Sequence, residues 1–123
     1  MLIKDFYKII DLTSSETGIT ASIKLNPHHE VYKGHFPDQP VVPGVAQLQI
    51  VKEILESHFG EELFMGNISQ VKYLIPINPN EVTELNISIN PKIDMEGNIK
   101  TNLLISFGEA IFTKAKITFS VVK

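Results

Sequence analysis

The sequence predicts an α+β domain in which one antiparallel sheet curls around a single helix. Residues 45–58 have the length and apolar spacing of a helix, and Gly60 follows them as a stop signal. Beyond the helix, several segments alternate apolar and polar residues, which is typical of strands with one buried face. One buried helix followed by a run of antiparallel strands is characteristic of this fold class. We expect residues 1–123 to form a single domain.

The segments before the helix are short. Residues 6–10 are apolar and fit a helix turn that runs into a strand, whereas residues 14–18 have the composition of a turn. Residues 19–25 alternate apolar and polar side chains as a half-buried strand does, and Asn26 and Pro27 end this pattern. A loop then leads to the helix.

The predicted helix is apolar over more of its surface than one narrow stripe. A helix of this kind is typically wrapped by other elements rather than lying on a surface. We therefore expect it at the centre of the domain. Its apolar positions are Val45, Leu48, Ile50, Val51, Ile54, Leu55 and Phe59.

The part of the chain after the helix is rich in strand patterns. We expect a first strand that is interrupted around Gly66 and Asn67, and then a proline-containing loop over residues 76–80. Three further strands follow, separated by a turn at residues 95–98 and by Gly108. The four predicted strand segments are residues 63–73, 84–90, 99–107 and 114–121.

The overall composition excludes several classes of function. The formal net charge is −3 and the isoelectric point is about 5.8, so no basic stripe is available to follow nucleic-acid phosphates. The chain has no cysteine, which excludes disulfides and thiolate chemistry. Residues 1–5 reach charged side chains too early for a secretory apolar core, and no apolar run approaches the roughly 20 residues that span a bilayer. We expect a cytoplasmic protein.

The segment from Gly34 to Gly44, GHFPDQPVVPG, is the most informative about function. It places His35, which can exchange a proton near neutral pH, on a proline-stiffened loop just before the glycine that opens the helix. The free N–H groups and positive dipole of a helix N-terminus can polarise a carbonyl oxygen. Removing a proton from the carbon next to a carbonyl group requires both a base and a group that polarises the carbonyl oxygen.

This motif resembles the β-hydroxyacyl-acyl carrier protein dehydratases of fatty-acid synthesis (FabZ/FabA-like). These proteins have the hotdog fold, a long antiparallel sheet wrapped around one central helix. Residues 71–81, VKYLIPINPNE, are similar to the family's strand-then-proline segment. The resemblance implies that His35 is the catalytic histidine and that the backbone N–H of Gly44 polarises the thioester carbonyl.

The chain departs from the family pattern on the second turn of the helix. The catalytic Glu or Asp of the family lies five residues after the glycine, where this chain has Gln49. The family commonly has a Gln four residues later, where this chain has Glu53. In this chain the amide therefore comes first and the acid four residues later, and both still lie on one helix face. Relative to the family pattern, the carboxylate lies about one turn further along the helix, roughly 5.4 Å along the axis.

The amide at position 49 leaves three outcomes open, because the leaving hydroxide must be protonated and an amide has no proton of suitable acidity. Glu53 can act as a displaced acid. Alternatively, His35 can serve as both base and acid while Gln49 positions the hydroxyl. In the third outcome the chain no longer dehydrates. Loss of a general acid typically costs about 10²–10⁴ in rate.

The resemblance also bears on substrate and partners. The apolar helix residues can line an acyl tunnel, so the predicted substrate-binding residues are Phe36, Pro43, Val45 and Leu48. A carrier protein is acidic and needs a basic dock. Family members often have arginines just after the strand equivalent to residues 71–73, but this chain has Leu74 and Ile75 there, with only Lys72 and Lys33 nearby. Coenzyme A and a specialised acyl carrier protein therefore both remain open as the thioester carrier.

We therefore expect a dehydratase-like protein that converts a β-hydroxyacyl thioester to a trans-2-enoyl thioester in fatty-acid or polyketide-type synthesis, without a metal or cofactor. In the family the histidine and the helical acid of one site come from different subunits, so we expect a homodimer or a heterodimer with a related chain. Two alternatives remain. One is an acyl-thioesterase in which His35 and Gln49 hold a water. The other is a non-catalytic thioester-binding subunit of a heteromeric dehydratase.

Overall fold

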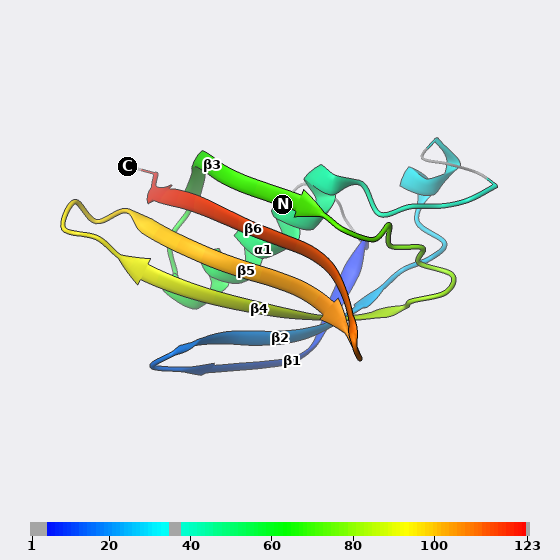
Figure 1. Ribbon diagram of the computed structural model, residues 1–123, viewed down its shortest axis with the longest axis horizontal. Helices are drawn as coiled ribbons and strands as arrows, with labels where there is room; N and C mark the ends of the chain where they lie inside the picture. Colours follow the sequence, from blue (N-terminus) through cyan, green and yellow to red (C-terminus); the bar gives the residue numbers. More distant parts are fainter. Residues whose placement is uncertain (1–4, 35–37, 123) are drawn as a thin grey trace.

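The computed structural model describes residues 5–34 and 38–122, in which one α-helix packs against one six-stranded antiparallel sheet (Figure 1). The spatial order of the strands is β1-β2-β4-β5-β6-β3. The α+β prediction is confirmed. The elements in chain order are β1 (Tyr7–Ser15), β2 (Gly18–Leu25), the 3-10 helix η1 (Glu30–Lys33), α1 (Gly44–Phe59), β3 (Leu63–Tyr73), β4 (Glu84–Ile93), β5 (Ile99–Phe107) and β6 (Ala110–Val121).

The core lies between α1 and the sheet. Alternate residues of the central strands point to one face and are buried there, whereas the residues between them are mostly exposed. In β2, for example, Ile19, Ala21 and Ile23 are buried. The helix contributes Ala46, Gln47, Leu48, Ile50, Val51, Ile54 and Leu55 to the same core. In the view of Figure 1, α1 lies behind the sheet, so the outer face of the sheet is turned toward the reader.

The helix ends where the sequence predicts. Gly60 adopts the left-handed conformation with φ 68°, which a glycine reaches without steric cost, and its N–H donates to the carbonyl of Glu56 at 2.8 Å. The carboxylate of Glu56 then accepts a hydrogen bond from the backbone N–H of Leu63 at 2.8 Å. This bond links the end of the helix to the first residue of β3.

Several boundaries differ from the expectation. Residues 7–15 form one strand that ends inside the predicted turn of residues 14–18, so the turn itself is confined to Glu16 and Thr17 between β1 and β2. The predicted interruption of β3 takes the form of two register shifts, between Met65 and Asn67 and between Ile68 and Gln70, within a continuous strand. The short helix η1 was missed, and β6 begins at Ala110 rather than near Lys114.

The two edge strands, β1 and β3, carry exposed apolar side chains. The examples on β3 are Phe64, Ile68 and Tyr73, and the examples on β1 are Ile9, Ile10 and Leu12. An edge strand presents unpaired backbone groups, and exposed apolar residues beside them favour addition of another chain. No helix among the described residues has both the length and the apolar character needed to cross a membrane.

Candidate active site

The N-terminus of α1 has backbone donors that no side chain caps. The helix begins at Gly44 after Pro43, and the structure shows no side-chain cap and no acidic residue in the first turn. The N–H groups of Ala46 and Gln47 both donate to the carbonyl of Pro43 at 3.1 Å. The N–H groups of Gly44 and Val45 have no acceptor among the described residues. Two donors at the positive end of the helix dipole are thus available to an anionic or polarised oxygen.

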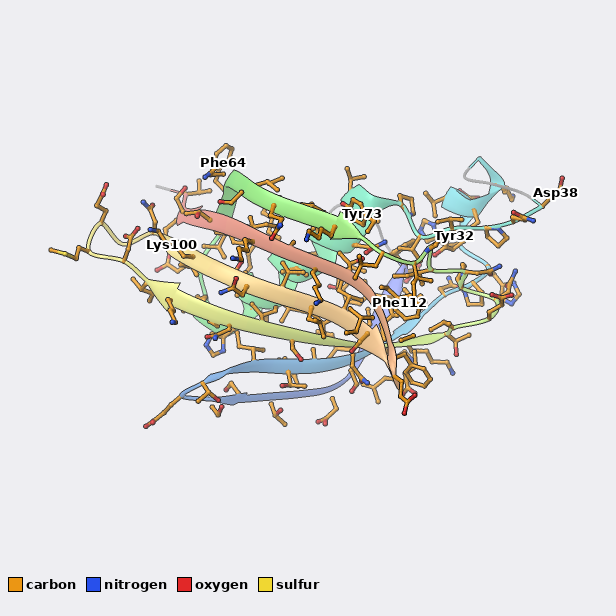
Figure 2. The ribbon with its side chains drawn as sticks, in the orientation of Figure 1. Tyr32, Asp38, Phe64, Tyr73, Lys100 and Phe112 are labelled. Atoms are coloured by element: carbon orange, nitrogen blue, oxygen red, sulfur yellow. The ribbon has the colours of Figure 1, made fainter. Side chains whose placement is uncertain are left out.

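The absence of a side chain at Gly44 lets the ring of Tyr73 lie against the helix start. A Cβ atom on Gly44 would be 2.6 Å from Cζ and 2.7 Å from the hydroxyl oxygen of Tyr73. Figure 2 shows Tyr73 at the end of β3, beside the first turn of α1. Burial raises the pKa of Tyr73, so its hydroxyl stays protonated and can donate a hydrogen bond at neutral pH. The start of the helix and the end of the edge strand therefore form one site.

A buried amide holds this end of the helix in place. The side chain of Gln47 donates to the carbonyl of Val42 at 3.3 Å and accepts from the hydroxyl of Thr113 at 2.5 Å. Both Gln47 and Thr113 are buried, so a lost partner would leave an unsatisfied polar group. The N–H of Val42 in turn donates to the carbonyl of Ile77 at 2.9 Å. The chain just before the helix is thus tied to both α1 and the following loop.

The side chains of Gln49 and Glu53 meet on one helix face. The amide Nε2 of Gln49 donates to Oε2 of Glu53 at 3.0 Å, and the hydroxyl of Tyr7 on β1 donates to Oε1 of the same carboxylate at 2.8 Å. An ionised carboxylate can only accept, so the nitrogen of the Gln49 amide must face Glu53. The amide oxygen of Gln49 is left to accept a hydrogen bond from another group.

Gln49 also borders a hollow of about 410 Å³. The other lining residues are charged or small: Lys52, Glu56, Gly60, Glu61 and Glu62. None of the predicted acyl-lining residues Pro43, Val45 and Leu48 borders this hollow. The hollow runs to Gly60 at the C-terminal end of α1, and Gly44 at the helix start does not border it.

The structure places the predicted site residues as follows. Gly44, Gln49 and Glu53 lie on the first three turns of α1, with Gln49 and Glu53 in contact. Val45 is 73% exposed, whereas Leu48 lies in the core at 6%. The catalytic and substrate-binding roles of these residues stay predictions. His35 and Phe36 lie outside the described residues.

Sequence reasoning missed three contributors: Tyr7, Tyr73 and Thr113. Each reaches the helix through tertiary pairing, which local sequence patterns do not encode. One signal was available, because Gln47 is a polar residue directly flanked by the apolar residues Ala46 and Leu48. Among residues 5–34 and 38–122, no group of three His, Cys, Asp or Glu side chains could hold a metal ion.

The sequence matches the family model of ApeI-like proteins, ApeI dehydratase, over residues 11–106. Two similar relatives are the 3-hydroxyacyl-(acyl-carrier-protein) dehydratases FabZ of Levilactobacillus brevis and Lactobacillus helveticus. The first is 29% identical, covering 94% of this chain and 82% of the relative. The second is 27% identical, covering 93% of this chain and 80% of the relative.

Solved structures share the fold. The dehydratase heterocomplex ApeI:P from Xenorhabdus doucetiae contains a chain with a TM-score of 0.75 and 23% identity, covering 91% of this chain and 96% of that chain. A hypothetical thioesterase from Streptococcus pneumoniae, solved with coenzyme A, has a TM-score of 0.64 and 12% identity, covering 94% of this chain and 85% of that chain. At these identities the likeness shows the fold alone, and it confirms the predicted hotdog fold.

Replacing Gly44 with alanine should destabilise the protein because the added methyl group meets the ring of Tyr73. Because the end of this half-exposed ring can move, the cost in the free energy of unfolding should lie at the lower end of the range for overpacking, about 1 kcal/mol, which urea denaturation measures. In a Tyr73→Ala background the same substitution should cost little. Gly34→Ala is the control, since its Cβ would have no atom of the described residues within 4 Å. An equal cost of Gly44→Ala in both backgrounds would contradict the contact.

Replacing Tyr7 with phenylalanine should cost about 1 kcal/mol near neutral pH by removing the hydrogen bond to Glu53. Burial, together with this bond and the Glu53 charge, raises the pKa of Tyr7 above its ordinary value of about 10. The unfolded state then loses the phenol proton first, so the free energy of unfolding should fall as the pH rises above about 10. Tyr7→Phe should make this fall shallower, and an unchanged pH dependence would contradict the assignment.

Proposed function

Because this chain belongs to the ApeI-like family of dehydratases, we propose that it acts on a β-hydroxyacyl thioester and gives the trans-2-enoyl thioester and water. The observation that carries this proposal is the uncapped N-terminus of α1, where the N–H groups of Gly44 and Val45 are available to a thioester oxygen. Stabilising the enolate-like charge on that oxygen lowers the barrier to removing the adjacent proton. The relationship to FabZ dehydratases supports the same reaction class.

In the proposed reaction His35 removes the proton from the carbon next to the carbonyl and returns it to the leaving hydroxyl. The hydroxyl then departs as water and the double bond forms, so protons and electrons balance without another acid. Gln49 accepts a hydrogen bond from the substrate hydroxyl through its amide oxygen, which leaves a lone pair on the hydroxyl for the incoming proton. The orientation of that amide, set by Glu53, supports this role.

Glu53 is proposed as a positioning residue rather than a displaced acid. Donors from Gln49 and Tyr7 face its two carboxylate oxygens, so its acceptor positions serve to hold the amide. Tyr7 belongs to β1, which ties this arrangement to the far edge of the sheet. The proposal thereby selects the second of the three outcomes left open by the sequence.

We further propose that a second chain, identical or related, adds to the sheet at β3. This strand is 11 residues long, pairs within the described residues only with β6, and exposes Phe64 and Ile68. The same strand delivers Tyr73 to the helix start, so a partner placed there reaches the candidate site. The likeness to a chain of a dehydratase heterocomplex supports a related chain as one such partner. A cytoplasmic location and a role in fatty-acid or polyketide-type synthesis remain parts of this proposal.

A non-catalytic role in such a complex is the second candidate, and the amide at position 49 favours it. In that case this chain binds the thioester while the partner supplies the helical acid. The protein alone would then leave β-hydroxyacyl thioesters unchanged, and activity would appear only with the partner chain. Release of free thiol without enoyl product would instead indicate a thioesterase.

Incubation of the purified protein with a β-hydroxyacyl coenzyme A thioester should give enoyl product, followed by its ultraviolet absorbance. His35→Ala should reduce this rate by at least about 10²-fold, because the proposed base is lost. Gln49→Glu should raise the rate about tenfold or more. The new carboxyl group would lie beside the carboxylate of Glu53, and repulsion between like charges should favour the protonated form of the new group.

Asn102→Asp is the matched control for Gln49→Glu, since it also converts an amide to a carboxyl group, at an exposed position on β5 away from the proposed β3 interface. It should leave the rate within about twofold of the original protein. An unchanged rate in Gln49→Glu would refute the view that a missing acid limits the reaction. Full activity in His35→Ala would refute the proposed base.

Placing a charge on the β3 edge should disrupt the proposed assembly. Ile68→Lys introduces a lysine beside the unpaired backbone groups, and we expect a monomer by light scattering where the original protein is a dimer. Ile10→Lys is the matched control on the β1 edge, where a similarly exposed isoleucine is replaced. Loss of the dimer in Ile10→Lys but not in Ile68→Lys would move the interface to β1.

A further inference from the structure

The hydroxyl group of Tyr73 lies beside the uncapped start of α1. A Cβ atom on Gly44 would be 2.7 Å from this hydroxyl oxygen, so the oxygen occupies space that a side chain at position 44 would fill. Two bonds of about 1.5 Å separate such a Cβ from the Gly44 nitrogen, which puts the hydroxyl oxygen at most about 5.7 Å from that nitrogen. Two donors this close can share one acceptor oxygen, because each hydrogen bond spans about 2.9 Å.

Strand pairing fixes the side of the sheet on which Tyr73 lies. Tyr73 stands opposite Thr113 on β6, and opposed residues of an antiparallel pair share one face. The hydroxyl of Thr113 donates to the buried amide of Gln47 on α1, so this face is the one that covers the helix. The next residue, Leu74, donates its backbone N–H to the carbonyl of Phe112 at 2.7 Å, which anchors the chain directly after Tyr73. In Figure 2 the labelled side chains of Tyr73 and Phe112 lie toward the same end of the sheet.

The chain itself makes no use of the Tyr73 hydroxyl. Within the described ranges 5–34 and 38–122 it has no hydrogen-bond partner. The ring alone covers the helix start, so a phenylalanine would pack there equally well. The side chain is 50% exposed, which leaves the hydroxyl accessible to a ligand. Burial of the other half raises the pKa of Tyr73, so the group is a hydrogen-bond donor at neutral pH.

We propose that Tyr73 is a catalytic residue whose hydroxyl donates a hydrogen bond to the thioester carbonyl oxygen, beside the N–H of Gly44. This inference rests on the proposed function, because it names a further donor for the same substrate. A carbonyl oxygen has two lone pairs, so it can accept from a backbone N–H and from a hydroxyl at once. Negative charge develops on this oxygen as the neighbouring proton is removed, and donors that are already in place stabilise it. Tyr73 keeps its own proton, so the proton balance of the proposed reaction is unchanged.

Two other roles fit Tyr73 less well. A general acid works best when its pKa is near the operating pH, whereas burial moves the pKa of Tyr73 further above neutrality. Tyr73 therefore does not replace the missing helical acid at Gln49. A purely structural residue would need only the ring against Gly44, because the hydroxyl makes no bond to the described part of the chain.

Tyr73→Phe tests the proposal because it removes the donor and keeps the ring. The turnover of a β-hydroxyacyl coenzyme A thioester should fall at least about tenfold, with kcat and kcat/KM lowered by the same factor. The urea midpoint should stay unchanged, since no hydrogen bond within the described chain is lost. A rate equal to that of the original protein would overturn the proposal.

Tyr32→Phe is the matched control, since the hydroxyl of Tyr32 also has no hydrogen-bond partner in the described part of the chain. Tyr32 lies on η1, where it is 5% exposed and its ring centroid is 5.9 Å from that of Phe6. A hydroxyl buried in this way is not presented to a ligand, so the rate should stay within about twofold of the original. An equal fall in Tyr32→Phe and Tyr73→Phe would overturn the assignment.

Polarisation of the carbonyl is measured directly with butyryl coenzyme A that is isotopically labelled at the carbonyl carbon. This saturated thioester has no β-hydroxyl group and cannot be dehydrated. Hydrogen bonds to a carbonyl oxygen lower its stretching frequency, so the infrared difference spectrum should show a larger downshift with the original protein than with Tyr73→Phe. Tyr32→Phe should match the original protein. Equal downshifts in Tyr73→Phe and the original, or no downshift in the original, would overturn the proposal.

The rate and the carbonyl frequency separate this inference from the proposed function. A Tyr73-dependent downshift in a protein that leaves β-hydroxyacyl coenzyme A unchanged would refute dehydration and support Tyr73 as a donor to a bound thioester. Dehydration that is unaffected by Tyr73→Phe, with an unaffected carbonyl frequency, would refute the role of Tyr73 alone.

Discussion

The geometry of this molecule depends on one buried amide, the side chain of Gln47. It joins the chain before the helix, through the carbonyl of Val42, to strand β6, through the hydroxyl of Thr113. Because all three groups are buried, rotating the helix would break hydrogen bonds that water cannot replace. The amide therefore fixes the helix around its own axis and sets the direction in which the donors at Gly44 point.

Two turns of the same helix carry two different kinds of chemistry. The first turn presents backbone donors at Gly44 and Val45, which are independent of side-chain identity. The second presents Gln49, whose orientation depends on Glu53 and, through it, on Tyr7 in a distant strand. A change at Tyr7 can therefore alter which atom of Gln49 meets a ligand, without altering the helix start. In the proposed reaction, thioester binding and proton delivery therefore depend on different groups of the helix.

The sequence predicted the features that depend on local patterns. The central helix, its stop at Gly60 and strand Ile99–Phe107 were confirmed because periodicity and a glycine signal are local. The spacing of Gln49 and Glu53 on one face was confirmed for the same reason. The contacts of Tyr7 and Tyr73 with the helix could not be predicted from local spacing, because they depend on how the strands pack in three dimensions. Tyr7 and Glu53, for example, are 46 residues apart in the sequence. The role of His35 still rests on the motif.

The strand order has a consequence for the time at which the candidate site can form. Strand β3 follows the helix directly but pairs with β6, and β4 and β5 come between them in the sequence. Tyr73 and Thr113 stand opposite each other in that pairing, and they contact Gly44 and Gln47. During synthesis on the ribosome, the helix emerges long before residue 113 can support it. This end of the helix is thus among the last parts of the domain to be completed.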